Sequence, residues 1–176
     1  TTMLKVYGRA NSSNVRKVLW VADEIGIPLN RDDWGRGFRS TDEPEFKQVS
    51  IFGGVPVIDD DGFILRESNT IVRYLCSKHG RADLYPSELR RRARVEAWMD
   101  WGSTDLYQGA RTVFLGLSVK SPPYQNAHML EMATTDWTRQ MQRLNAELES
   151  GSQYLAGDSF TIADIPTGIV VNRWYH

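Results

Sequence analysis

One stretch of the chain carries residue types suited to binding a small acidic peptide. In "FGGVPVIDDDGFILRES", the pair Glu67-Ser68 follows eleven residues after Pro56. Because proline cannot donate to a sheet ladder, Pro56 should begin a strand. We predict a cis Val55-Pro56 bond, which turns the Val55 N–H and C=O toward an extended peptide. Ser68 at a helix start leaves backbone N–H groups and a positive dipole end for a carboxylate.

This stretch resembles the glutathione-binding signature of the cytosolic glutathione S-transferases. In that signature a Val–cis-Pro step pairs with the cysteinyl part of glutathione, and a Glu/Gln-Ser pair holds the γ-glutamyl group. The resemblance therefore implies that Val55, Pro56, Glu67 and Ser68 bind glutathione. The resemblance extends from about Met3 to Trp174. Within the family, the chain is similar to the bacterial, serine-type, theta- and nu-like members. The family usually has Asn-Pro where this chain has Ser50-Ile51, a difference in the loop rather than in the binding chemistry.

The resemblance also implies that the protein stabilises the glutathione thiolate, since the thiolate is the nucleophile. Ser12, Ser13 and Asn14 stand at the start of the helix expected from Val15, where a hydroxyl or amide donor can face the sulfur. Similarity to the theta- and nu-like loops selects Ser12 as the catalytic donor, with Asn14 second and Ser13 as a further candidate. Plain helix capping is the alternative for each, and Tyr7 is the alternative donor of tyrosine-type members.

Other residues are expected to complete the glutathione site. Arg39, together with Arg36, is placed to face the glycine carboxylate of glutathione as a bidentate donor. Trp34 is expected to pack on the peptide. Asp105, in "TDLYQ", resembles the acidic residue that reaches across a dimer to the γ-glutamyl amine. The alternatives are solvated charges for Arg36, Arg39 and Asp105, and a core position for Trp34.

A pocket for the second substrate is expected to combine the first loop with a later helix. Its predicted lining residues are Arg9, Asn11, Tyr107 and Arg111. Tyr107 and Arg111 share a helical face by their spacing, although packing in the core explains the same pattern.

Composition excludes several other function classes. The 176 residues carry a net charge of −1, so no bulk attraction to nucleic acid is implied. No apolar run approaches the ~20 residues of a membrane span, and the N-terminus lacks a signal-peptide pattern. Cys76 is the single cysteine, which excludes an intrachain disulfide and fits a reducing cytoplasm. The three histidines are His79, His128 and His176. They are too widely spaced in the sequence to match the ligand spacing of a zinc site.

The elements that position these residues differ between the two halves of the chain. The first half predicts the order β-α-β-α-β-β-α, the thioredoxin-like layout. Its expected elements are a strand over 3–7, a helix from 15 to 25, a strand over 29–34, a helix over 44–49, strands over 56–58 and 63–65, and a helix from 67.

The second half predicts helices only. One long helical stretch is expected from Glu88 to Leu117, and Ser121 to Pro123 should break it. A further long helix is expected from Gln125 to Leu148. Thr161 and Asp164 have the spacing of a capping box and resemble the cap of the buried core helix in the transferase family.

Together these observations predict an α/β thioredoxin-like N-terminal domain over 1–80 and an all-α C-terminal helical domain over 88–176, incomplete at its end. The resemblance implies a cytoplasmic, homodimeric detoxification enzyme. It would transfer glutathione to a small hydrophobic electrophile, or use it to reduce a peroxide or mixed disulfide. Glutathione is the expected co-substrate, with no tightly bound cofactor, metal, nucleic acid or membrane. The alternative is a non-catalytic glutathione-fold binding or regulatory protein.

Overall fold

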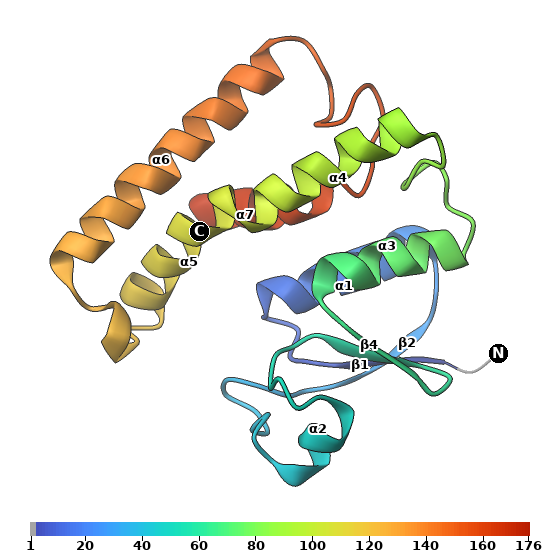
Figure 1. Ribbon diagram of the computed structural model, residues 1–176. Coiled ribbons are helices and arrows are strands. Elements are labelled where there is room, and N and C mark those ends of the chain that lie inside the picture. Colours follow the sequence, from blue (N-terminus) through green and yellow to red (C-terminus); the bar gives the residue numbers. More distant parts are fainter. Residues whose placement is uncertain (1–2) are drawn as a thin grey trace. The chain divides into compact units, whose positions relative to one another are not determined.

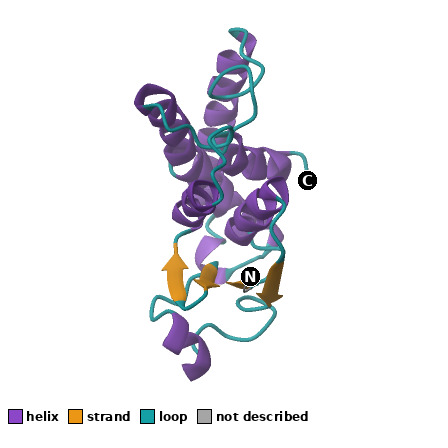
Figure 2. Cartoon of the chain, turned by 90° about the vertical axis from the view of Figure 1, so that its right-hand side faces the viewer, coloured by secondary structure: helices purple, strands orange, loops and turns teal. Residues whose placement is uncertain are grey.

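The computed structural model describes residues 3–176, which form two compact units that divide between Tyr85 and Pro86 (Figure 1). The four named strands all belong to the first unit, and the named elements of the second unit are helices (Figure 2). The first unit follows the predicted thioredoxin-like order. Its elements are β1 (Leu4–Tyr7), α1 (Ser13–Ile25), β2 (Leu29–Asp32), α2 (Pro44–Val49), β3 (Val57–Asp60), β4 (Phe63–Arg66) and α3 (Ser68–Lys78).

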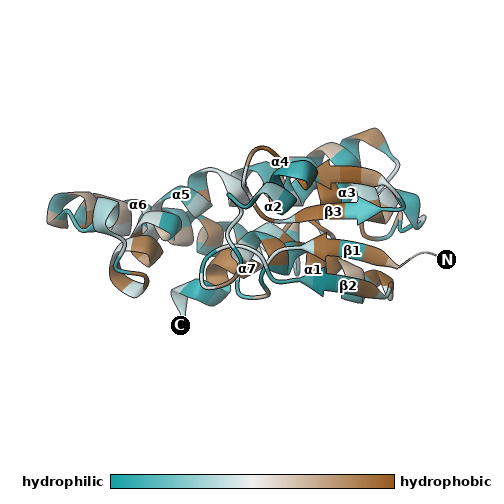
Figure 3. Cartoon of the chain, turned by 90° about the horizontal axis from the view of Figure 1, so that it is seen from below, coloured by the Kyte–Doolittle hydropathy of each residue, from teal (hydrophilic) through white to brown (hydrophobic). Residues whose placement is uncertain are grey.

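The sheet of the first unit has the strand order β2-β1-β3-β4. Strands β1 and β2 are parallel, whereas β3 is antiparallel to both β1 and β4. Figure 3 shows hydrophobic segments in β1 and β3, whose residues Leu4, Val6, Val57 and Ile58 are buried. Both faces of these central strands are covered. Helices α1 and α3 lie on one face and α2 lies on the other (Figure 1).

Each face of the sheet has its own core. Beneath α2, one cluster of buried side chains consists of Tyr7, Trp34, Phe46 and Val57. On the face of α1 and α3, the buried side chains of these helices include Val15, Val18, Ile71, Val72 and Leu75. Burial on both faces fixes the sheet and therefore fixes the loops that leave its ends.

Helix α1 begins and ends at residues that the sequence singles out. Ser12 is the N-cap, and its side chain accepts a hydrogen bond from the Val15 N–H. Gly26 closes the helix at φ 80°, a left-handed conformation that glycine adopts without the usual steric cost. The N-terminus of α1, which carries the Ser12–Asn14 group, is thus held at a defined position after β1.

The second unit contains α4 (Leu89–Ser103), α5 (Asp105–Val113), a π-helical turn (Phe114–Ser118), a 3₁₀ turn (Pro122–Tyr124), α6 (Ala127–Glu149) and α7 (Asp164–Trp174). Helix α5 packs along α6, and α4 packs along α7. One core cluster of this unit joins α5, α6 and α7 through Leu106, Ala110, Trp137 and Val170.

The single helix predicted over 88–117 is wrong at Thr104, where α4 ends and α5 begins. Thr104 has φ −114° and ψ −87°, outside the helical region. Its hydroxyl donates to the Asp100 carbonyl oxygen at 2.8 Å, a bond that competes with the helix ladder and favours a bend. The break allows α5 to run along α6 instead of continuing the axis of α4.

The capping group before α7 forms as predicted in its acidic half. One Asp164 carboxylate oxygen accepts the Thr161 N–H at 3.0 Å, and the other accepts the Leu155 N–H at 3.0 Å. The Thr161 hydroxyl accepts the Ala163 N–H at 3.3 Å rather than the N–H of Asp164. These bonds tie the preceding loop to the start of the buried helix.

Candidate functional site

A pocket of about 160 Å³ lies in the first unit, where the loop before β3 meets the starts of α1 and α3. Its walls combine residues that lie far apart in the sequence. They are Asn14, Ser50, Phe52, Gly54, Val55, Pro56, Arg66, Glu67 and Ser68. The Val55-Pro56 bond is cis, which confirms the prediction for this step. The fold thus gathers the Val-Pro step, the Glu-Ser pair and one residue of the Ser12–Asn14 group around one pocket.

The Glu67-Ser68 junction forms one wall of the pocket. Glu67 adopts φ 71° and ψ 109°, an unusual backbone conformation for a residue other than glycine. Such outliers persist where the surrounding structure enforces them, and they concentrate at functional sites. Ser68 then begins α3, so the first N–H groups of an eleven-residue helix lie beside the pocket.

A chain of polar contacts connects α1 to this junction. The Ser68 hydroxyl donates to the Asn14 side-chain oxygen at 3.4 Å. The Lys17 ammonium donates to the Ser68 hydroxyl oxygen at 3.5 Å and to the Asn69 side-chain oxygen at 3.4 Å. Lys17 is only 4% exposed, so an ammonium group is buried behind the pocket wall.

Lys17 was missed by the sequence interpretation, which assigned the buried face of α1 from apolar residues alone. The position of Lys17 relative to its helical neighbours could have indicated its burial. Lys17 lies three residues after Asn14 and four before Val21, on the side of the helix that Val21 buries. Burial of a lysine at such a position depends on the packing of α3, which starts 51 residues later than Lys17 in the chain.

Ser50 is a second pocket residue that the sequence interpretation did not select. Its side chain is 8% exposed, and its hydroxyl has no hydrogen-bond partner in the structure. A buried hydroxyl without a partner costs free energy, and it can be satisfied by a ligand that enters the pocket. Ser50 is also the residue at which the chain departs from the Asn-Pro of the family signature.

An ion pair and an aromatic ring form the outer rim of the pocket. The Arg66 guanidinium donates to a Glu67 carboxylate oxygen at 2.7 Å and lies 3.9 Å from the centre of the Phe52 ring. Arg66 and Phe52 were not predicted as site residues. Both side chains are exposed, so this rim borders the solvent.

The other residues of the Ser12–Asn14 group lie at the start of α1. Ser12 is 8% exposed and Ser13 is 7% exposed, and neither is among the pocket-lining residues. The hydrogen bond from the Val15 N–H to the Ser12 hydroxyl is long, at 3.5 Å, which leaves this oxygen weakly engaged. Tyr7 is 9% exposed and packs with Trp34 and Phe46 in the core. The catalytic assignment of Ser12, Asn14 or Ser13 stays a prediction.

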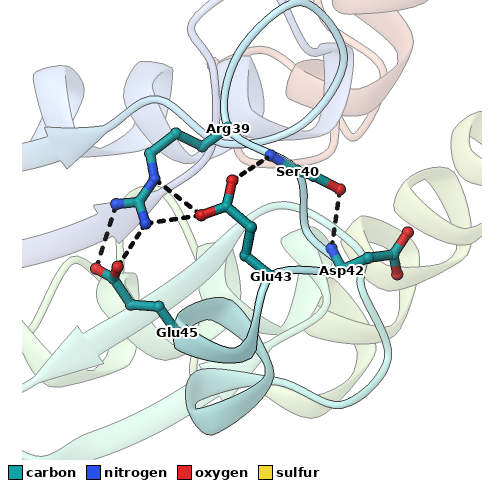
Figure 4. A network of polar contacts seen from close by, with 5 residues as sticks. All are labelled: Arg39, Ser40, Asp42, Glu43 and Glu45. Carbon is teal, nitrogen blue, oxygen red and sulfur yellow. Dashed lines mark hydrogen bonds and ion pairs between the residues drawn. The ribbon is translucent and has the colours of Figure 1, made fainter.

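Arg39 contacts acidic residues of the first unit (Figure 4), and Trp34 is buried in the core of that unit. The Arg39 guanidinium donates to the carboxylates of Glu43 and Glu45. It also stacks on the Trp34 ring, 3.9 Å from the ring centre. Trp34 is 1% exposed and contacts Phe46, with the ring centres 5.3 Å apart. A glutathione carboxylate would therefore compete with two acidic residues for Arg39.

The remaining predicted residues have different environments within their own units. In the first unit Arg9 is half-buried, with its guanidinium against Gly35, whereas Asn11 and Arg36 are exposed.

In the second unit Asp105 is exposed at the first turn of α5, and Tyr107 packs against the core cluster of that unit. Arg111 donates to the Tyr124 hydroxyl at 2.8 Å. These contacts leave the roles of the six residues as predictions.

Cys76 is buried in α3, and burial raises the pKa of its thiol to about 12. At neutral pH this residue is therefore a protonated thiol and a poor nucleophile. Over residues 3–176, no group of three or more His, Cys, Asp or Glu side chains gathers in a way that suits a metal ion. Within the same range, every helix is too short or too polar to cross a membrane.

Comparison with known proteins adds independent findings. Residues 6–83 match the family model "Glutathione S-transferase, N-terminal domain", and residues 110–174 match "Glutathione S-transferase, C-terminal domain". The chain is 33% identical to glutathione S-transferase GstB of Escherichia coli K12 over 165 residues, which cover 93% of this chain and 79% of GstB.

Comparison with solved structures agrees with these sequence matches. The fold is similar to a theta class glutathione S-transferase from Xanthomonas axonopodis pv. citri, determined with glutathione bound. The TM-score is 0.90 at 34% identity, and the match covers 100% of this chain and 84% of that chain. A poplar glutathione transferase F1, at 23% identity and a TM-score of 0.88, shares the fold over 98% of this chain and 81% of its own.

Proposed function

Because the chain belongs to the glutathione S-transferase family, and is a glutathione transferase, we propose that its pocket binds the γ-glutamyl end of glutathione. The observation that carries this assignment is the convergence of Asn14, Val55 and Ser68 around one pocket. The pocket volume of about 160 Å³ is below the ~300–1,000 Å³ of sites for drug-sized ligands, which suits one amino-acid moiety rather than the whole tripeptide.

The pocket offers a partner for each charge of the γ-glutamyl group. Its α-carboxylate would accept hydrogen bonds from the Ser68 hydroxyl and from the N-terminal N–H groups of α3, where the helix dipole favours an anion. Its α-ammonium would pair with Glu67 in exchange for Arg66. The unpartnered Ser50 hydroxyl would gain a hydrogen bond from the ligand.

The rest of glutathione would extend from the pocket along Val55, with its backbone paired to the Val55 N–H and C=O. The sulfur would then lie near the start of α1, where the Ser12 hydroxyl donates to the thiolate and Asn14 assists. The thiol proton leaves to solvent, and the thiolate attacks an electrophilic carbon to form a carbon–sulfur bond as the leaving group departs. A peroxide or mixed disulfide is the other proposed class of substrate, with a second glutathione as reductant.

We also propose a cytoplasmic homodimer in which Asp105 of one subunit completes the site of the other. Arg9, Asn11, Tyr107 and Arg111 stay the proposed lining of the electrophile pocket. Arg39 would bind the glycine carboxylate only after it releases Glu43 or Glu45.

Calorimetric titration with glutathione tests the binding assignment. Ser68→Ala should weaken binding, because it removes a hydrogen bond to a charged group worth ~1.5–3 kcal/mol. Ser77→Ala is the matched control, since Ser77 is an exposed serine toward the end of the same helix. Absence of saturation with millimolar glutathione, or equal losses for both variants, would remove the pocket from the glutathione site.

A further inference from the structure

Lys17 is a buried titratable group for which the proposed chemistry has no role. Lysine is rarely fully buried, and this side chain is 4% exposed. Its hydrogen-bond partners include the uncharged side chains of Ser68 and Asn69, at 3.5 and 3.4 Å. Ser68 lines the pocket, so the ammonium group lies one side chain behind the proposed carboxylate position.

The charges around Lys17 leave its protonation responsive to a ligand. Burial lowers the pKa of Lys17 to about 8, and the negative charge of Glu67, at the N-cap of α3, opposes that shift. The Glu67 carboxylate is itself held by Arg66 of β4. On α1, the adjacent Arg16 is an exposed residue. A new anion beside Ser68 would add to the effect of Glu67 and favour the protonated ammonium.

We propose that Lys17 is an electrostatic positioning residue for glutathione, and that binding of the γ-glutamyl carboxylate is coupled to uptake of one proton by Lys17. The protonated ammonium holds the Ser68 hydroxyl in place and attracts the carboxylate through it. The neutral amine, formed as pH rises, lacks that charge. This inference rests on the proposed glutathione site and adds to it a residue that does not line the pocket.

The coupling has a definite sign. Well below pH 8 Lys17 carries its proton both with and without ligand, so no proton is exchanged and affinity is at its maximum. As pH rises through 8 the free protein loses the proton, and binding must restore it. Affinity therefore falls as pH rises, by about fourfold between pH 6.5 and pH 8.5 for a group that titrates near 8.

The experiment uses S-methylglutathione, which has no thiol, so that ionisation of the sulfur does not contribute. Calorimetric titrations at pH 6.5 and pH 8.5, each in two buffers of different ionisation enthalpy, give the dissociation constant and the number of protons exchanged. For the wild-type protein we expect almost no exchange at pH 6.5 and an uptake of roughly 0.7 proton at pH 8.5.

Three variants assign the proton. Lys17→Met should bind more weakly at pH 6.5 and lose the Lys17 share of the uptake at pH 8.5. Lys17→Arg should keep the charge at both pH values, because guanidinium does not titrate there, and so flatten the pH profile. Lys78→Met is the control, since Lys78 lies at the opposite end of α3, exposed and paired with Asp60, and its loss should leave the wild-type profile.

Each outcome decides a different question. Wild-type binding with equal affinity and no proton exchange at both pH values would overturn the role of Lys17 and leave the glutathione site intact. Equal proton uptake by wild type and Lys17→Met would assign the proton to another group and also overturn it. Failure of S-methylglutathione and glutathione to bind at any pH would overturn the proposed site and this inference together. If Lys17→Met does not fold, the proton exchange of the wild-type protein and the pH profile of Lys17→Arg still decide whether Lys17 takes up the proton.

Discussion

The hydroxyl group of Ser12 has two candidate functions. As a helix cap it accepts the Val15 N–H, but the 3.5 Å distance makes this a weak bond. As a thiolate donor it would use its hydrogen, which the cap does not engage. The two roles are therefore compatible in one side chain, and a stability measurement alone does not separate them.

Replacement of Ser12 by alanine should raise the pKa of the thiol of bound glutathione by about one unit, which corresponds to ~1.4 kcal/mol. This is a reasonable size for one charge-assisted hydrogen bond. The thiolate absorbance of the complex, followed against pH, measures the shift, while glutathione affinity should change little. Asn14→Ala and Tyr7→Phe are the comparisons. An unchanged pKa in Ser12→Ala together with a raised one in Asn14→Ala would transfer the role to Asn14.

The sequence predicted the part of the site that lies in two short motifs and missed the part that depends on packing. The Val55-Pro56 step and the Glu67-Ser68 pair were recognisable because each consists of two adjacent residues at a characteristic spacing in the sequence. Lys17 and Ser50 were not, because their burial depends on elements that lie elsewhere in the chain. Chemical type alone would place a lysine on the surface.

At the scale of elements, the sequence predicted the order of the first unit correctly but treated α4 and α5 as one helix. Helical periodicity continues through Thr104, so a pattern of apolar residues cannot detect the change of axis there. Two glycines on either side of Thr104 are better indicators of this change, because each lies where its helix packs closely against another helix. A Cβ on Gly102 would lie 2.7 Å from the Thr167 hydroxyl oxygen on α7. A Cβ on Gly109 would lie 2.8 Å from the Ala133 carbonyl oxygen on α6.

Gly109→Ala should therefore destabilise the protein. Alanine gains about 1 kcal/mol in helix propensity, but the new methyl group meets the backbone of α6, and overpacking of this kind costs ~1–3 kcal/mol. We expect a net loss of up to ~2 kcal/mol in the free energy of unfolding, measured by urea denaturation. Gln108→Ala, at the exposed neighbouring position, should be neutral or slightly stabilising. A more stable Gly109→Ala variant would mean that α5 and α6 separate without cost.

At the scale of the whole molecule, the proposed dimer would add a second carboxylate to the proposed glutathione site. The γ-glutamyl ammonium is left to Glu67, which is already paired with Arg66. Asp105 is exposed at the first turn of α5 and is thus accessible to a second copy. A carboxylate supplied by another subunit would complete the charge balance of the bound ligand.

Light scattering at micromolar concentration should therefore give twice the chain mass of 20.1 kDa. Asp105→Asn should weaken glutathione binding several-fold and leave the dimer intact, whereas Asp158→Asn, in an exposed loop, should change neither. A monomeric mass would exclude Asp105 from the site. An intact dimer with unchanged affinity in Asp105→Asn would do the same.

The sheet topology has a consequence for folding of the protein during its synthesis on the ribosome. Of the four strands, β1 is synthesised first, and the last, β4, pairs with β3 and ends at Arg66. Every strand pairing therefore lies within residues 4–66, which are synthesised before α4. At synthesis rates of ~5–20 residues per second, the sheet has several seconds to close while the later helices are still being translated. The unit that holds the pocket can thus be assembled before the helical unit is complete.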